Sequence, residues 1–162
     1  PTHMSAWGKH VLGWGETIEA NGTTDYSLKS NDMADFNMIK ITTADPREYF
    51  LVENRSINGY DRALNIIQGA YNGGLAIWHI DENQFSNSNE NHKLVDLEEM
   101  NDAGLDTRAH RGHANNLMFA GNATEFTRST TPNSNNYSNT ATGIEITNAS
   151  IQGEVMTLTV KK

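Results

Sequence analysis

Residues 35–55, DFNMIKITTADPREYFLVENR, are the stretch of this sequence that decides its fold. Apolar and β-branched residues fill two runs, 35–43 and 48–55, which favour extended strands. Between them, Ala44-Asp45-Pro46-Arg47 has the composition of a turn, since Pro fixes φ and Asp can bond its own backbone. The pattern therefore predicts a β-hairpin.

Four segments downstream of this hairpin also read as strands: residues 75–80, 93–100, 143–147 and 154–161. The first, LAIWHI, follows two glycines and is almost wholly apolar, which is typical of a strand covered on both faces. The second and the last alternate apolar with polar residues, which is typical of strands with one buried face.

Upstream of the hairpin, residues 3–14 predict the one helix of the chain. Thr2 or Ser5 can cap its start, and Gly13 and Gly15 end it. The residues that recur at three- or four-residue steps, and so predict one apolar face, are Met4, Trp7, Val11 and Trp14.

These elements predict an α+β, mainly β fold: one N-terminal helix followed by about six to eight mostly antiparallel strands with long polar loops. The 162 residues are enough for a single domain, which we expect to span residues 1–162. Two long segments, 81–92 and 101–139, show no periodicity. Irregular loops of this length are usually functional, ordered by ions or disordered.

The composition excludes several classes of partner and site. Acidic residues number 20 against 12 basic ones, for a formal net charge of -8, which argues against nucleic acid as a partner. No apolar run is long enough to span a membrane, so no membrane partner is expected. The absence of Cys excludes disulfides, thiolate zinc sites and Cys nucleophiles.

The candidate catalytic residues form no recognisable motif. A zinc site on a helix needs two His four residues apart with a Glu beside the first, and no pair among the six His has that arrangement. We therefore expect His3 and His10 to pack on the helix face, and His110 and His113 to lie on the surface. No G-x-S-x-G motif is present for serine catalysis. Core positions are expected for all three Trp residues, Trp7, Trp14 and Trp78.

Carboxylates after residue 80 point to a calcium site. Calcium takes six to eight oxygens, often from Asp, Asn and backbone carbonyls of irregular loops. The candidate ligands open the polar loop that follows residue 80 and recur along the next strand; they are Asp81, Glu82, Asp96, Glu98 and Asp102. No EF-hand spacing is present, and a solvated acidic edge strand is the competing interpretation. If calcium binds the folded state alone, chelation is expected to lower the melting temperature.

Three segments, in order along the chain, carry a resemblance to a known family. They are residues 2–14 (THMSAWGKHVLGW), 49–61 (YFLVENRSINGYD) and 74–81 (GLAIWHID). The first resembles the helix that follows the zinc site in the immune inhibitor A family of secreted metalloproteases, and the other two are similar to that family's next blocks. Thr131-Pro132-Asn133-Ser134 and residues 143–160 are similar to the family's C-terminal stretch, so the resemblance covers nearly the whole chain.

The resemblance implies the C-terminal part of the catalytic domain of a zinc endopeptidase, exported from a bacterial cell and often stabilised by calcium. The family's zinc ligands and general base lie on an HExxH helix, which the resemblance places before Pro1. No catalytic residue, cofactor-binding residue or zinc ligand is therefore carried over, and we expect the chain alone to be inactive.

The resemblance also implies partners and a local departure. The implied partners are the N-terminal half of the protease domain and, in the intact protein, a protein or peptide substrate. Relatives often have two aspartates after the Gly that corresponds to Gly112, where this chain has His113 and Asn116. If those aspartates bind calcium in relatives, that site is weakened or lost here.

Two other classes of function stay open. One is a non-catalytic β domain that binds calcium or glycan within a larger secreted protein. Upstream sequence decides between this β domain and the protease. An HExxH motif shortly before Pro1 supports the protease, and an unrelated linker there supports the β domain. The other is a self-contained glycan hydrolase, which requires two carboxylates facing one cleft.

Overall fold

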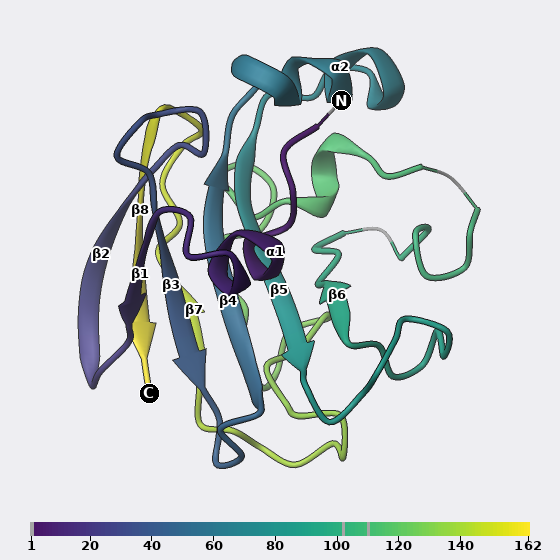
Figure 1. The fold of residues 1–162 in the computed structure, drawn as a ribbon. Coiled ribbons are helices and arrows are strands. Elements are labelled where there is room, and N and C mark those ends of the chain that lie inside the picture. Colours follow the sequence, from purple (N-terminus) through teal and green to yellow (C-terminus); the bar gives the residue numbers. More distant parts are fainter. Residues whose placement is uncertain (1, 102, 110) are drawn as a thin grey trace.

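The computed structural model describes residues 2–101, 103–109 and 111–162, which form two β-sheets and a helical layer (Figure 1). The larger sheet has the strand order β1-β3-β4-β5-β6. Its strands are β1 (Glu16–Glu19), β3 (Asn37–Thr42), β4 (Glu48–Arg55), β5 (Gly74–Asp81) and β6 (Val95–Leu97). The smaller sheet has the order β2-β8-β7. Its strands are β2 (Thr23–Lys29), β7 (Glu145–Thr147) and β8 (Val155–Lys161).

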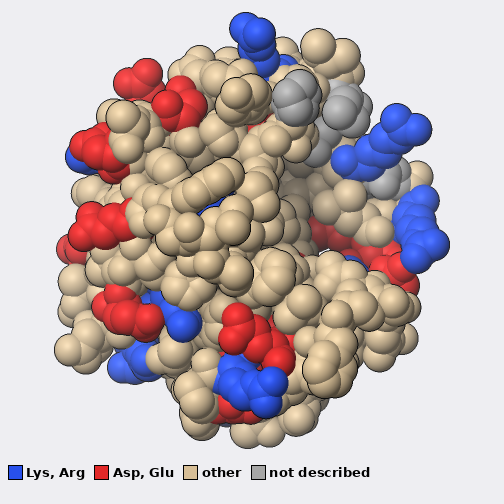
Figure 2. All heavy atoms as spheres, in the orientation of Figure 1, with Lys and Arg blue, Asp and Glu red and all other residues tan. Residues whose placement is uncertain are grey.

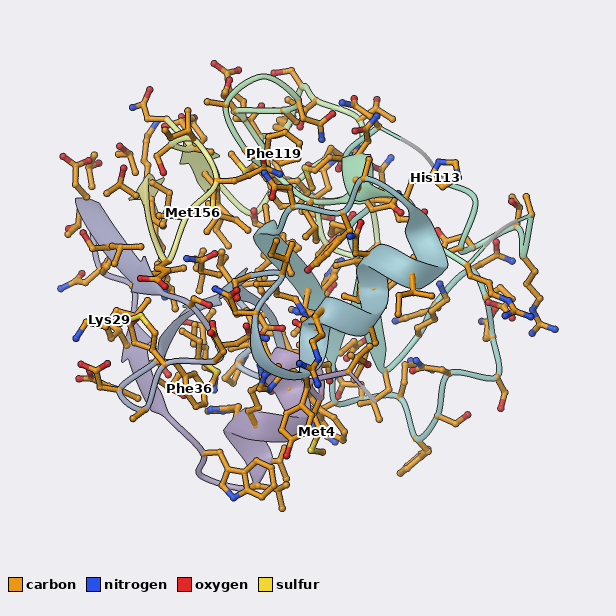
Figure 3. The ribbon with its side chains drawn as sticks, turned by 90° about the horizontal axis from the view of Figure 1, so that it is seen from above. Met4, Lys29, Phe36, His113, Phe119 and Met156 are labelled. Atoms are coloured by element: carbon orange, nitrogen blue, oxygen red, sulfur yellow. The ribbon has the colours of Figure 1, made fainter. Side chains whose placement is uncertain are left out.

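The main core lies between the two sheets. Side chains such as Ile41 and Phe50 from the larger sheet meet Val160 from the smaller one, and all three are fully buried. The opposite face of the larger sheet is covered by α1 (Ala6–Val11). Figure 3, seen from above, shows Met4 with α1 on one side and Met156 with the smaller sheet on the other. The layers are therefore helix, five-stranded sheet and three-stranded sheet.

The predicted α+β, mainly β fold is confirmed. The predicted hairpin forms as β3 and β4, with Ile39 opposite Val52. Its turn is closed by the amide of Glu48, which donates to the carbonyl of Asp45 at 3.0 Å. The four predicted downstream strands form as β5, β6, β7 and β8. β1 runs parallel to β3, and the other strand pairs of the two sheets are antiparallel, as predicted for most of them.

Three elements were not predicted. A second helix, α2 (Arg62–Gln68), follows the 3-10 turn η1 (Gly59–Asp61), so the expectation of a single helix is wrong. Its seven residues are too few to show a helical period. The strands β1 and β2 also lack a sequence signal. Most of their residues are exposed or half-buried, so neither strand needs an alternation of apolar and polar residues.

The apolar face predicted for the first helix is largely exposed. Ser5 caps α1 as expected, accepting a hydrogen bond from the amide of Gly8. However, Val11 is 58 % exposed and Trp14 is 54 % exposed, whereas Ala6 and Lys9 are buried. The helix therefore packs on the sheet through Ala6, Lys9 and, in part, Trp7, and leaves Val11 and Trp14 largely exposed.

The segment 101–139 is irregular, as its lack of periodicity indicated. Among its described residues, regular structure is limited to the 3-10 turn η2 (Ala114–Asn116) and a few isolated bridges. One bridge joins Met118 to Leu75 at the start of β5, and another joins Phe126 to Ile146 in β7. No helix in the described ranges has the length and apolarity of a membrane-crossing helix.

Candidate functional site

Four charged side chains meet behind α1 and form what we call the buried charge cluster: Lys9, Glu53, Arg55 and Asp61. Each residue is at most 7 % exposed. Lys9 pairs with Glu53, Arg55 pairs with both Glu53 and Asp61, and the two cations balance the two carboxylates. Burying charges is tolerated only when they are paired and hydrogen-bonded, so the cluster holds α1, β4 and η1 in one arrangement.

Arg55 uses all five of its N–H groups. Nε and Nη2 donate to the two carboxylate oxygens of Asp61 at 2.9 and 2.7 Å, and Nη1 donates to Glu53 at 3.1 Å. The two remaining N–H groups donate to the backbone carbonyls of Met4 and His3 at 3.3 and 3.1 Å. Burial lowers the pKa of Arg55, but the neighbouring carboxylates outweigh it and raise the pKa, so the guanidinium stays charged. Its donors are therefore fully occupied by the protein.

Asp61 is the acceptor that joins the N-terminal segment to this cluster. Besides Arg55, its carboxylate accepts hydrogen bonds from the backbone amide of His3 and from the side-chain amide of Asn31, both at 2.8 Å. Burial raises the pKa of Asp61, but the hydrogen bonds and charge of Arg55, with the bond from Asn31, outweigh burial and lower it. The carboxylate is therefore held in its ionised form.

This lowered pKa predicts how stability depends on acid. Because the pKa of Asp61 is lower in the folded than in the unfolded chain, its contribution is present above about pH 4 and is lost as the pH falls through the folded-state pKa. Urea unfolding of the wild type between about pH 6 and pH 2 should show this loss. Asp61→Asn should show a shallower dependence below about pH 4, and equal slopes for the two proteins would contradict the assignment.

A cavity of about 200 Å³ opens beside α1, where Figure 2 shows a hollow to the right of the centre. We call it the leucine cavity after four of its lining residues, Leu64, Leu97, Leu105 and Leu117. Its lining also includes polar residues: Thr2, His3, Ser5, Tyr71, His113 and Asn116. Ala76 and Trp78 line it from β5, and Arg55 of the buried charge cluster also reaches it. The Nε1 of Trp78 donates to Glu53 at 3.0 Å, so this wall is tied to the cluster.

A second groove lies on the other side of the N-terminal segment. It has a volume of about 370 Å³, and its lining includes Met4, Trp14, Phe36 and Tyr60. Met4, Trp14 and Tyr60 are about half exposed. Figure 2 shows that the face over α1 carries few charged side chains. We refer to the exposed apolar residues here as the α1 patch; they are Met4, Val11, Leu12, Trp14 and Tyr60.

Four of the five predicted calcium ligands face a protein donor. Asp81 lies 2.6 Å from Nε2 of His92, and Glu82 accepts from Tyr49 and Trp7 at 2.9 and 3.2 Å. Asp96 accepts from Lys93 at 2.7 Å, and Glu98 lies 3.1 Å from Nδ1 of His79. Asp102 lies outside the described residues. The remaining members of the predicted set are Asp81, Glu82, Asp96 and Glu98.

The structure does not bring these four carboxylates together into one ligand set. Within residues 2–101, 103–109 and 111–162, no three His, Asp or Glu side chains are grouped closely enough to hold a metal ion. The predicted ligands lie instead at the end of β5, along β6 and just after it. The calcium site therefore stays a prediction.

Sequence reasoning gave Glu98 as a calcium ligand but did not bring it together with His79 and Glu48, and we call this group the His79 clamp. His79 on β5 is buried, with Nε2 3.0 Å from Glu48 and Nδ1 3.1 Å from Glu98. A neutral imidazole carries one N–H, so only the imidazolium can donate to both carboxylates. Burial lowers the pKa of His79, but the bonds to Glu48 and Glu98 outweigh it and raise the pKa.

Tyr137 completes this clamp from the irregular segment. Its ring stacks on His79 with centroids 4.2 Å apart, and its other neighbour is His92 at 4.1 Å. The backbone amide of Tyr137 donates to Glu48 at 2.7 Å, to the same oxygen that faces His79. Glu48 pairs with Asp81 across β4 and β5, which places it beside the end of β5, but nothing near Tyr137 in the sequence indicates the contact of Tyr137 with Glu48.

His3 and His10 were expected to pack on the helix face, and His110 and His113 to lie on the surface. These expectations agree in part with the structure. His3 precedes α1 and contacts Tyr60, and His10 contacts Tyr49, with burial lowering the pKa of both imidazoles. His113 caps η2, and His110 lies outside the described residues.

The expectation for the three Trp residues is confirmed only in part. Trp7 and Trp78 are partly buried against the core. Trp14 is 54 % exposed, so the core position predicted for it is wrong.

Comparison with known proteins gives no further assignment. No protein-family model matches this chain, and searches of curated proteins and of solved structures found no match either.

Proposed function

We propose that this chain is the C-terminal portion of a secreted zinc endopeptidase domain similar to the immune inhibitor A family. In that role it supports the active-site cleft and is not catalytic alone. The observation that carries the proposal is the meeting of three resembling segments at the buried charge cluster. Residues 2–14 supply Lys9, residues 49–61 supply the other three charges, and residues 74–81 supply Trp78.

This arrangement explains why those segments would recur together in order. A buried ion pair that loses one partner is strongly destabilising, so residues 2–14 and 49–61 constrain each other through Lys9 and Glu53. Trp78 adds a hydrogen bond from β5 to the same carboxylate, Glu53. The resemblance therefore falls on residues that hold one structural unit together.

The α1 patch supports packing against a further part of a larger domain. Exposed apolar residues gathered on one face mark an interaction surface in a soluble protein. On this proposal the patch and the groove beside it contact the N-terminal half of the protease domain. That half would supply the HExxH helix, whose two His residues would hold the zinc, and the metal would supply Lewis-acid activation of water.

On this proposal a longer protein contains this chain, and the activity test compares the two. We expect no casein cleavage by the 162-residue chain with added zinc, and cleavage sensitive to a zinc chelator by the longer protein. The matched control is the longer protein with the Glu of its HExxH motif replaced by Gln, which should lose activity by several orders of magnitude. Chelator-sensitive cleavage by the short chain, or an upstream sequence without HExxH, would sink the proposal.

A further inference from the structure

The leucine cavity has the size and walls of a site for one apolar group. Its volume of about 200 Å³ exceeds the roughly 150 Å³ of an apolar cavity known to take up benzene. Leu64, Leu97 and Leu105 are only partly buried, so their side chains form accessible walls rather than closed core. The hollow in Figure 2 gives access from outside.

The charges behind the cavity do not favour a charged occupant. Arg55 lines the cavity, but its five N–H groups are already donated to Asp61, Glu53 and two backbone carbonyls. The buried charge cluster as a whole contains two cations and two carboxylates. A charged ligand would lose its hydration in the cavity, and Arg55 has no unused donor with which to offset that loss. Charge complementarity therefore selects a neutral occupant.

The cavity walls on β5 and β6 are held in place by hydrogen bonds within the protein, before any ligand binds. Trp78 lines the cavity while its Nε1 donates to Glu53, and Leu97 lies opposite Trp78 in the β5–β6 pairing. A preformed wall lowers the conformational cost of binding. It also lets the cavity discriminate by size, because side chains of the sheet cannot easily move apart.

From these observations we infer that the leucine cavity binds one neutral apolar side chain of a peptide, of the size of Leu or Phe. That the peptide is a substrate rests on the proposed function, whereas binding itself is a property of this chain. The cavity would then select substrates by a large apolar residue.

The three Trp residues allow a direct test by ¹⁹F NMR of the chain labelled with 5-fluorotryptophan. Trp78 lines the leucine cavity, Trp14 lines the second groove, and Trp7 lines neither. Each resonance is assigned by Trp→Phe substitution. N-acetyl-L-leucinamide and N-acetyl-L-phenylalaninamide should shift the Trp78 resonance saturably, and N-acetyl-L-glutaminamide should not. The signals of Trp7 and Trp14 should stay unchanged.

Two matched substitutions locate the site. Leu105→Asn should weaken binding of N-acetyl-L-leucinamide by about tenfold, since it removes one apolar wall residue. Leu12→Asn, on the α1 patch, should leave it unchanged. No Trp78 shift up to the solubility limit, equal shifts with the glutamine probe, unchanged binding in Leu105→Asn, or a shift of Trp14 alone would each overturn the inference.

The inference and the proposed function fail separately. Binding is measured on the chain without zinc and without cleavage, so an inactive longer protein would leave a positive binding result standing. Conversely, a longer protein that cleaves casein, combined with no Trp78 shift, would remove the cavity assignment and leave the peptidase proposal intact.

Discussion

Asp61→Ala is expected to lower the free energy of unfolding by about 3–5 kcal/mol, a large part of the stability of a domain this size. The carboxylate is fully buried and accepts four hydrogen bonds, two of them from Arg55. Its removal leaves two cations of the buried charge cluster facing the single carboxylate of Glu53. The amide of His3 and the side chain of Asn31 also lose an acceptor. Urea denaturation at neutral pH measures the effect.

The matched control is Asp35→Ala. Asp35 also pairs with a cation, Lys29, but this pair lies at the surface. Exposed ion pairs contribute little because water and salt screen them, so no measurable change in stability is expected. If Asp61→Ala were no more destabilising than Asp35→Ala, the buried charge cluster would not be the element that holds α1 to the sheet.

Most strands of this fold could be predicted from the sequence, whereas the orientation of α1, which depends on the buried charge cluster, could not. β3, β4, β5 and β8 are buried on at least one face, and their apolar runs or alternation mark them in the sequence. The orientation of α1 could not be read in the same way. Charged residues are almost never fully buried unless paired, and the partner of Lys9 is Glu53, 44 residues away. Periodicity alone therefore identifies the apolar face of the helix but not the face that packs on the sheet.

The candidate site shows the same limit. Carboxylates after β5 suggested a calcium site, because their residue types and loop context suit that ion. Some of their partners come from other elements: Glu82 accepts from Tyr49 and Trp7, 33 and 75 positions away, and Glu98 lies against His79. The sequence of residues 81–102 alone does not reveal partners that lie outside this range. The leucine cavity was likewise hidden, because its walls come from α2, β5, β6 and the irregular segment.

His79→Ala is the second substitution with a large expected effect, also a loss of about 3–5 kcal/mol in the free energy of unfolding. The side chains of Glu48 and Glu98 are 9 % and 15 % exposed and would face each other without the imidazolium between them. The ring contacts of His79 with Phe50 and Tyr137 are lost as well. Denaturation near pH 6 measures the loss, and His10→Ala, at a half-buried imidazole on α1, should cost less than about 1 kcal/mol.

A double variant separates lost charge pairing from lost packing. In His79→Ala the destabilisation arises partly from two carboxylates left without their shared cation, so adding Glu98→Gln should recover part of it. In the wild-type background Glu98→Gln should instead be destabilising, because it weakens a bond to the imidazolium. The sign of the Glu98→Gln effect therefore depends on whether His79 is present. If the sign is the same in both backgrounds, His79 acts in the core as a packed ring, and the two carboxylates do not depend on its charge.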